Sequence, residues 1–407
     1  MSRAGDRSTI REGDGPVSAG RAFDEGALVA EARQRAGLGD FGDEFFREPL
    51  RVLLTSLRDE AGLNAVGIAS QRARLVDSLV TRLMAEEQRR RHPEIEDERL
   101  DPPVVIVGLA RTGTTLLHRL LASGGDWRTA RWWEVRYPAP FPGSDWRRDD
   151  PRIPAAHEEI RLTLEAVPQL AAIHPWDAEG ADEEIMLLEH SFMSHVPESG
   201  ADLPGYRAWL DRQDLRPAYR DLARWLRLLQ WQKKQAGRDL GARWLLKAPF
   251  HLGYLDALFE VFPGARLVLT HRDPLETIPS AASMYSALWA LARDEVDETR
   301  VGAQVQRRYA WALGRCMEAR TRYPGERFLD VDYRAVQRAP MAEVRRIYRW
   351  LGVPLSDPAR RAMEGWLADD ARHEREAHRY SLAQFGFDPE ELAAVFADYR
   401  RLHVLPA

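Results

Sequence analysis

Cysteine is almost absent from this sequence of 407 residues, which contains only Cys316. A single cysteine excludes an intramolecular disulfide and a zinc site built from several cysteines. We expect Cys316 to be a buried helix residue.

Long apolar runs are missing as well. No run approaches the ~20 residues that a membrane-spanning helix needs. The first 25 residues are charged and rich in glycine, without the apolar segment of a signal peptide. The sequence therefore predicts a soluble, cytoplasmic protein with no integral membrane segment.

Neither sign of charge is in large excess. The 58 lysine and arginine residues stand against 63 aspartate and glutamate residues, which gives a formal net charge of −5. This balance supplies no basic field of the kind that binds nucleic acid. The hydrophobic fraction of 44% is normal for a globular protein with a substantial core.

The most informative stretch runs from Pro103 to Ser123 and reads PVVIVGLARTGTTLLHRLLAS. Its residues 104–107 predict a short buried strand that Gly108 ends, and the later leucines recur at the spacing of a helix that opens at Thr114. Strand, glycine-containing loop and helix N-terminus together form an anion site, because free backbone N–H groups and the helix dipole point at one spot.

The distance between Gly108 and Gly113 is that of a P-loop, but Thr114 stands where the Walker form has lysine. The cation is Arg111, inside the loop, and no apolar run ending in aspartate follows downstream. Phosphoryl transfer from ATP usually needs Mg²⁺ held by such an acid, whereas a less charged sulfuryl group can be transferred without a metal. The loop therefore favours a phosphosulfate donor, with a metal-dependent nucleotide or small-molecule kinase as the alternative.

Strands predicted at 244–247, 266–271 and 328–331, with a helix at about 252–262 between the first two, indicate a parallel sheet. The fold class is therefore α/β. Ligands bind at the carboxyl ends of such strands, so segments far apart in the sequence should converge there. Further helices are predicted near 154–167, 183–194, 217–236, 274–292 and 300–322.

Four segments together resemble the sulfotransferases that use 3′-phosphoadenosine 5′-phosphosulfate (PAPS). The loop GLARTGTTLLHRLL resembles their 5′-phosphosulfate loop. The segment Arg266–Ser280, RLVLTHRDPLETIPS, resembles their 3′-phosphate motif, a strand followed by an arginine and, eight positions later, a serine. Two others, Trp244–His251 (WLLKAPFH) and His378–Phe387 (HRYSLAQFGF), resemble a strand and a nucleotide-binding loop of bacterial members.

The likeness covers about residues 102 to 390 and is to the bacterial and tyrosylprotein-type branch. The lysine-containing loop, catalytic-histidine segment and dimer motif of the animal cytosolic enzymes are not recognisable. The resemblance implies a P-loop-like three-layer domain with a central parallel sheet at 102–407. It would be preceded by a helical N-terminal layer at 25–101, to which we assign no chemistry, and a disordered tail at 1–24.

The resemblance also implies that PAPS is the co-substrate and that no metal takes part. The 3′-phosphate would be held by Arg272 and Ser280, and arginine suits this task because its planar fork makes two charge-assisted bonds to phosphate. Arg379 would close over the nucleotide. The 5′-phosphosulfate would be held by Arg111, Thr112, Gly113, Thr114 and Thr115, with Arg111 also acting in catalysis.

Three residues outside the loop are candidates for catalysis. Lys247 ends an apolar strand, where a lysine is costly unless an anion meets it, and it would neutralise the bridging oxygen as the S–O bond breaks. Glu134 and His251 compete as general base for the acceptor hydroxyl. Glu134 resembles the glutamate of tyrosylprotein-type enzymes, and Trp132 and Trp133 would raise its pKa by desolvation. His251 follows Lys247, and histidine is the usual base. We expect Glu134 to be the base and His251 a positioning residue.

The acceptor is predicted only as a class, the hydroxyl of a small molecule or lipid-like compound. A lipid, polyketide, quinone, steroid or phenol would suit. Candidates for the acceptor cavity are Glu183, Glu184 and His190 and the apolar set Trp132, Trp133, Tyr137, Phe141, Met284, Tyr285 and Trp289.

Overall fold

A computed structural model of the chain describes residues 19–168, 170–173, 176–239, 241, 243–370 and 381–404. The sequence predicts a disordered tail at 1–24. Residues 1–18 lie outside the described residues, but helix α1 (Ala19–Ala22) shows that the prediction is wrong from residue 19 onward. Ala22 and Phe23 are each only 1% exposed, because they pack into the core.

Four parallel strands form the central sheet, as the sequence predicts. They are β1 (Val104–Gly108), β2 (Leu245–Lys247), β3 (Arg266–His271) and β4 (Phe328–Asp332), in the order β2-β1-β3-β4. Strand β1 lies at the centre, with Val105 opposite both Leu246 and Leu267. The strand ends near Gly108, Lys247 and His271 therefore meet along one edge.

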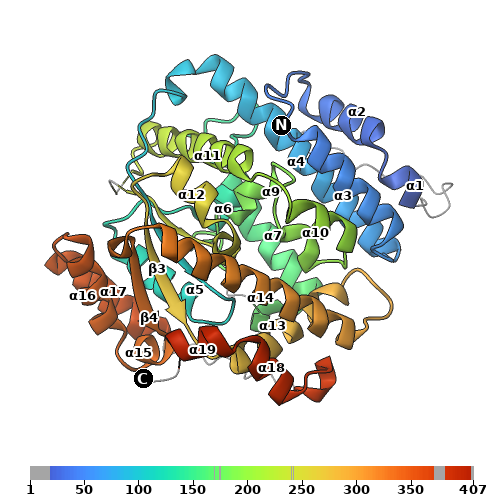
Figure 1. Ribbon diagram of the computed structural model, residues 1–407. Helices are drawn as coiled ribbons and strands as arrows, with labels where there is room; N and C mark the ends of the chain where they lie inside the picture. Colours follow the sequence, from blue (N-terminus) through green and yellow to red (C-terminus); the bar gives the residue numbers. More distant parts are fainter. Residues whose placement is uncertain are drawn as a thin grey trace.

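Side chains of successive β1 residues enter two different cores, because strand side chains alternate between faces. Val104 and Ile106 pack with α5 (Thr114–Ser123), α16 (Pro340–Leu351) and α17 (Asp357–Asp370). Val105 and Val107 pack on the opposite face, where the covering helices are α11 (Arg216–Gln235), α12 (Leu255–Val261), α13 (Pro274–Trp289) and α14 (Glu298–Arg322). In Figure 1, α16 and α17 lie to the left of β3 and β4, and α13 and α14 lie to their right, so the three-layer prediction is confirmed.

The N-terminal layer consists of α2 (Glu25–Ala36), α3 (Arg47–Asp59) and α4 (Ala65–Arg91). Asp24 and Asn64 cap α2 and α4 by accepting backbone N–H groups. The layer shares one hydrophobic core with the sheet. A buried ion pair at 2.8 Å, between Arg82 of α4 and Asp221 of α11, also joins the two parts.

The remaining predicted helices are present with shifted ends. The helix predicted at 183–194 is limited to α9 (Ile185–Glu189), and Phe192 beyond it has a φ of 55° that no helix tolerates. Cys316 is buried in α14, as expected. None of the described helices is long and apolar enough to cross a membrane. The other described α-helices are α6 (Trp132–Arg136), α7 (Arg152–Ala166), α8 (Leu170–Ile173), α10 (Pro204–Leu210), α15 (Tyr333–Arg338), α18 (Pro389–Val395) and α19 (Ala397–His403).

A buried histidine makes the stability depend on pH. His118 of α5 is 1% exposed, and burial, aided by the charge of Lys247, lowers its pKa from 6.5 to about 4. As the pH falls from about 6.5 to 4, the unfolded chain binds a proton that the folded protein refuses. The free energy of unfolding should therefore drop by about 1.4 kcal/mol per pH unit from this group. His118→Gln should remove that contribution in urea titrations across this range. The exposed His157→Gln variant serves as a control, and an unchanged slope in His118→Gln would contradict the assignment.

Candidate active site

The loop after β1 adopts the strained backbone of an anion cradle. Arg111 has a φ of 71° and Gly113 a φ of 81°, and such left-handed residues turn backbone N–H groups toward one point. Glycine is required at Gly108, because a Cβ there would lie 2.1 Å from the Thr270 hydroxyl oxygen. Positive φ at the non-glycine Arg111 is costly and typical of functional sites.

The second predicted nucleotide motif lies directly against this loop. Arg272, just beyond β3, donates from its Nη1 to the Arg111 carbonyl oxygen at 3.0 Å, and its guanidinium lies 4.2 Å from the centre of the Tyr333 ring. Arg111 Nε in turn donates to the Ser280 hydroxyl at 3.2 Å. The structure thus brings Arg111, Arg272 and Ser280 together from segments more than a hundred residues apart.

Not every loop residue points its side chain at a ligand. Arg111, Gly113, Thr114 and Thr115 line the main cavity. Thr112 is fully buried, and its hydroxyl donates to the Leu109 carbonyl at 2.7 Å. Only the backbone of Thr112 is therefore available for an anion. Arg379 lies outside the described residues, so its part in closing over the nucleotide stays a prediction.

Lys247 occupies the end of β2 and is 1% exposed. Its ammonium group lies 3.3 Å from the Thr115 hydroxyl and forms an ion pair with Glu183. Its backbone N–H donates to Glu184 at 2.8 Å. Lys247 therefore links α5, which begins at the loop after β1, to Glu183 and Glu184.

His251 is completely buried and does not line the cavity. Its Nε2 donates to Glu184 at 2.6 Å, and its Nδ1 lies 2.7 Å from the Tyr219 hydroxyl. Burial works against the charge of Glu184, but His251 holds the pKa of that carboxyl below its ordinary value. Both ring nitrogens of His251 are thus engaged within the protein. The arrangement is that of a group that positions Glu184 and, through it, the backbone of Lys247.

Glu134 does not face the cavity, contrary to what the sequence indicates. It is 3% exposed, and its carboxylate lies 2.5 and 2.6 Å from the Lys233 ammonium. It also accepts the backbone N–H of Arg131 at 2.8 Å, which caps α6. The carboxylate is buried, as the sequence predicts, but it forms an ion pair with the buried Lys233. The geometry therefore corrects our expectation that Glu134 is the base.

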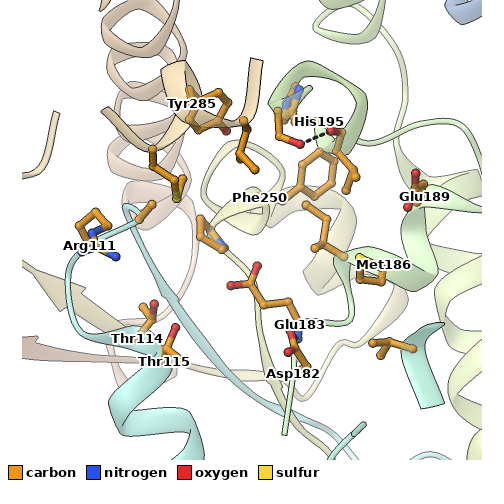
Figure 2. A pocket seen from close by; sticks show the side chains of 18 of the residues that line it. Arg111, Thr114, Thr115, Asp182, Glu183, Met186, Glu189, His195, Phe250 and Tyr285 are labelled. Carbon is orange, nitrogen blue, oxygen red and sulfur yellow. Dashed lines mark hydrogen bonds between the residues drawn. The ribbon is translucent and has the colours of Figure 1, made fainter. Parts of the chain in front are cut away.

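One large cavity of about 930 Å³ begins at the loop after β1 and is lined by residues of α4, α6, α9, α13 and α14 (Figure 2). Figure 2 shows Arg111, Thr114 and Thr115 on one side of it, Glu183 near the middle, and Met186 and Glu189 on the far side. Its size and largely apolar wall match those of small-molecule sites. The apolar part of the wall includes Leu170, Trp176, Ile185, Met186, Phe250, Met284, Tyr285 and Leu288.

The acceptor candidates divide into those that line this cavity and those that do not. Trp132, Met284, Tyr285, Glu183 and His190 line it. The sequence did not lead us to predict that α4 lines the cavity, although its lining residues recur at the spacing of one helical face. The candidates outside the lining are Trp133, Tyr137, Phe141, Glu184 and Trp289.

The loop at the end of β1 has the form of an anion cradle, and a largely apolar cavity adjoins it. Residues 102–357 match the model of the Sulfotransferase family. The chain therefore belongs to this family and is a sulfotransferase, which confirms the resemblance and sets the kinase alternative aside. Members of this family use PAPS as sulfuryl donor.

Two solved structures share this fold along nearly the whole chain. Sulfotransferase STF1 from Mycobacterium tuberculosis H37Rv is 33% identical, with a TM-score of 0.81, over 92% of this chain and 98% of that one. Sulfotransferase STF9 from Mycobacterium avium is 27% identical, with a TM-score of 0.84, over 94% and 97% of the two chains. A curated relative, the omega-hydroxy-beta-dihydromenaquinone-9 sulfotransferase Stf3 of Mycobacterium bovis, is 24% identical over 311 residues, 74% of this chain and 75% of that protein.

Glu134→Gln should destabilise the protein without slowing the chemical step. Removing one partner of a buried ion pair leaves Lys233 uncompensated, which typically costs about 3–5 kcal/mol of unfolding free energy. Burial already lowers the pKa of Lys233, and Glu134 opposes that shift. The double variant Glu134→Gln/Lys233→Met should recover much of the loss in urea unfolding. A fall in kcat of a hundredfold or more at unchanged stability would restore Glu134 as a catalytic residue.

Proposed function

We propose that this sulfotransferase binds PAPS in the cradle formed by the β1 loop and Arg272 and transfers its sulfuryl group to the hydroxyl of a lipid-like alcohol. The observation that supports this most directly is that Arg111 and Arg272, joined by a hydrogen bond, line one end of the cavity, and that Lys247 contacts Thr115 of the same lining. Three cations and a helix N-terminus suit a donor that carries a 3′-phosphate and a phosphosulfate.

The donor would lie with its phosphosulfate over α5. Thr114 and Thr115 line the cavity at the first turn of that helix, where their hydroxyls and the helix dipole favour negative charge. Arg272 and Ser280 would hold the 3′-phosphate. Arg272 is 23% exposed and already fixed by Glu276 at 2.8 Å, so its guanidinium is oriented before the nucleotide arrives.

Glu183 is the carboxylate best placed to accept the acceptor proton. It lies in the middle of the cavity between the phosphate loop and the apolar wall (Figure 2). Its ion pair with Lys247 places the base beside the group that would neutralise the departing phosphate oxygen. General base and electrostatic stabiliser are thus adjacent, as transfer to a hydroxyl requires.

The reaction would then proceed by in-line displacement at sulfur. The acceptor oxygen forms a bond to sulfur while the bond between sulfur and the bridging phosphate oxygen breaks. The electron pair of that bond stays on the 5′-phosphate of 3′-phosphoadenosine 5′-phosphate (PAP), where Lys247 would stabilise it. The hydroxyl proton passes to Glu183, and we propose that no metal takes part.

The body of the acceptor is inferred from the cavity and from a relative. Apolar side chains such as Ile185, Met186 and Phe250 make up much of the cavity wall, and the charged residues Arg74, Arg136 and Glu189 of this wall are each held in ion pairs. The relative Stf3 is named for a hydroxylated menaquinone. Both support an acceptor that presents its hydroxyl to Glu183 and buries an apolar body.

PAP should bind more tightly than AMP, because AMP lacks the phosphate that Arg272 would meet. Arg272→Ala should weaken PAP binding by about tenfold to a hundredfold, the worth of a hydrogen bond to a charged group, and leave AMP nearly unchanged. Calorimetry on both nucleotides measures this. Arg334→Ala is a matched control, because Arg334 also pairs with Glu276 but does not line the cavity. Equal affinities for PAP and AMP would contradict the proposal that Arg272 and Ser280 bind the 3′-phosphate.

Glu183→Gln should lower kcat by about 10²–10⁴, the usual contribution of a general base. The assay follows transfer from radiolabelled PAPS to an alcohol in the presence of EDTA, with Glu134→Gln as the matched substitution that should retain kcat. PAP affinity should hardly change, and the acidic limb of the pH–rate profile should disappear. A Glu183→Gln enzyme with near-normal kcat, or transfer that EDTA abolishes and Mg²⁺ restores, would contradict the mechanism.

A further inference from the structure

One face of α4 lines the cavity, although this helix belongs to the N-terminal layer. Its lining residues are Ser70, Ala73, Arg74, Asp77 and Ser78, which follow the spacing of a single helical face. Ser70, Ala73 and Arg74 are exposed, whereas Ser78 is buried. This face of α4 therefore runs from the interior of the cavity out to its mouth.

Ion pairs fix α4 to the elements on either side of this mouth. Arg74 forms a bidentate pair with Glu189 of α9, in which its Nη2 donates to Oε2 at 2.7 Å. Asp77 pairs with Arg136 of α6 at 3.4 Å, and Arg136 also holds Glu159 of α7 at 2.8 Å. These five residues, which we call the rim, join four helices around the opening.

The rim lies at the end of the cavity away from the chemistry. Figure 2 shows Met186 and Glu189 on the side opposite Arg111, Thr114 and Thr115, with Glu183 between the two groups. Glu183, Met186 and Glu189 are spaced three residues apart along the segment that ends in α9. An acceptor with its hydroxyl at Glu183 thus has Met186 beside its body and the rim beside its other end.

We propose that α4 forms the acceptor entrance, that Ala73 sets how far the acceptor extends, and that the acceptor is a neutral, elongated alcohol whose unreactive end passes the rim. This inference rests on the proposed function and specifies its substrate. The acceptor must be elongated because its hydroxyl would lie at Glu183, near the middle of the cavity, while the rim and the exposed Ser70 and Ala73 lie at the far end.

The charges of the rim indicate that the acceptor carries none at this end. Each rim residue pairs with another of opposite sign. Asp77 has a second partner, Arg35, at 2.8 Å. A charged acceptor terminus would have to break one of these pairs, whereas a neutral chain passes without disturbing them.

A cysteine label at position 73 tests the proposal on the folded protein. Cys316 is 5% exposed, and burial raises the pKa of its thiol to about 12, so a maleimide at neutral pH should react only with an introduced cysteine. Ala73→Cys would be labelled with N-benzylmaleimide and assayed with PAPS and linear primary alcohols from butanol to dodecanol. Ala362→Cys, at an exposed position of α17 outside the cavity, carries the same label as a control.

For the unlabelled enzyme, kcat/KM should rise by about fourfold for each added methylene, and the rise should stop once the chain reaches the rim. The label at position 73 should make the rise stop at shorter chains and leave the shortest alcohols unaffected, whereas the label at 362 should change nothing. Equal losses at every chain length, no effect at position 73, or an unlabelled enzyme that gains nothing from chain length would each overturn the proposal. Loss of PAP binding in calorimetry would instead refute the donor site of the proposed function.

Discussion

A buried ammonium group connects the residues of the proposed active site. Lys247 ends a strand in the middle of the protein, where a charge without a counter-ion is strongly unfavourable. Glu183 and Thr115 supply the partners, and Glu184 fixes the backbone beneath the lysine. His251 then donates to Glu184, and the Tyr219 hydroxyl pairs with the other ring nitrogen of His251. Each of these groups is explained by the need to stabilise or orient the one before it.

The parts of the molecule that the sequence predicts well are those governed by local rules. The run 104–107 fits a buried strand and forms one, and Gly108 and Gly113 stand where the turn leaves no room for a side chain or requires positive φ. Parallel pairing then brings Arg111 and Arg272 together without further information. The proposed nucleotide half of the site therefore follows from spacing and strand order.

The acceptor half depends on contacts between distant helices, which spacing does not reveal. Glu134 has the sequence context of a desolvated base, but Lys233, about a hundred residues later, turns toward it and neutralises it. From the sequence, Glu183 is only one of several candidates for the acceptor cavity, and the fold alone places Lys247 against it. Likewise, nothing in the local sequence shows that α4 reaches over the cavity. In each case the deciding partner lies on another element.

The two faces of α4 have different freedom to change. One face shares the core with the sheet and carries the buried Arg82–Asp221 pair, so substitutions there would strongly destabilise the protein. The face at the cavity mouth is exposed at Ser70 and Ala73, where replacements usually alter stability by less than about 0.5 kcal/mol. Mutation could therefore redesign the entrance while donor site and fold stay intact. A scaffold arranged in this way can acquire new acceptors in evolution, or in the laboratory, through a few surface changes on a single helix.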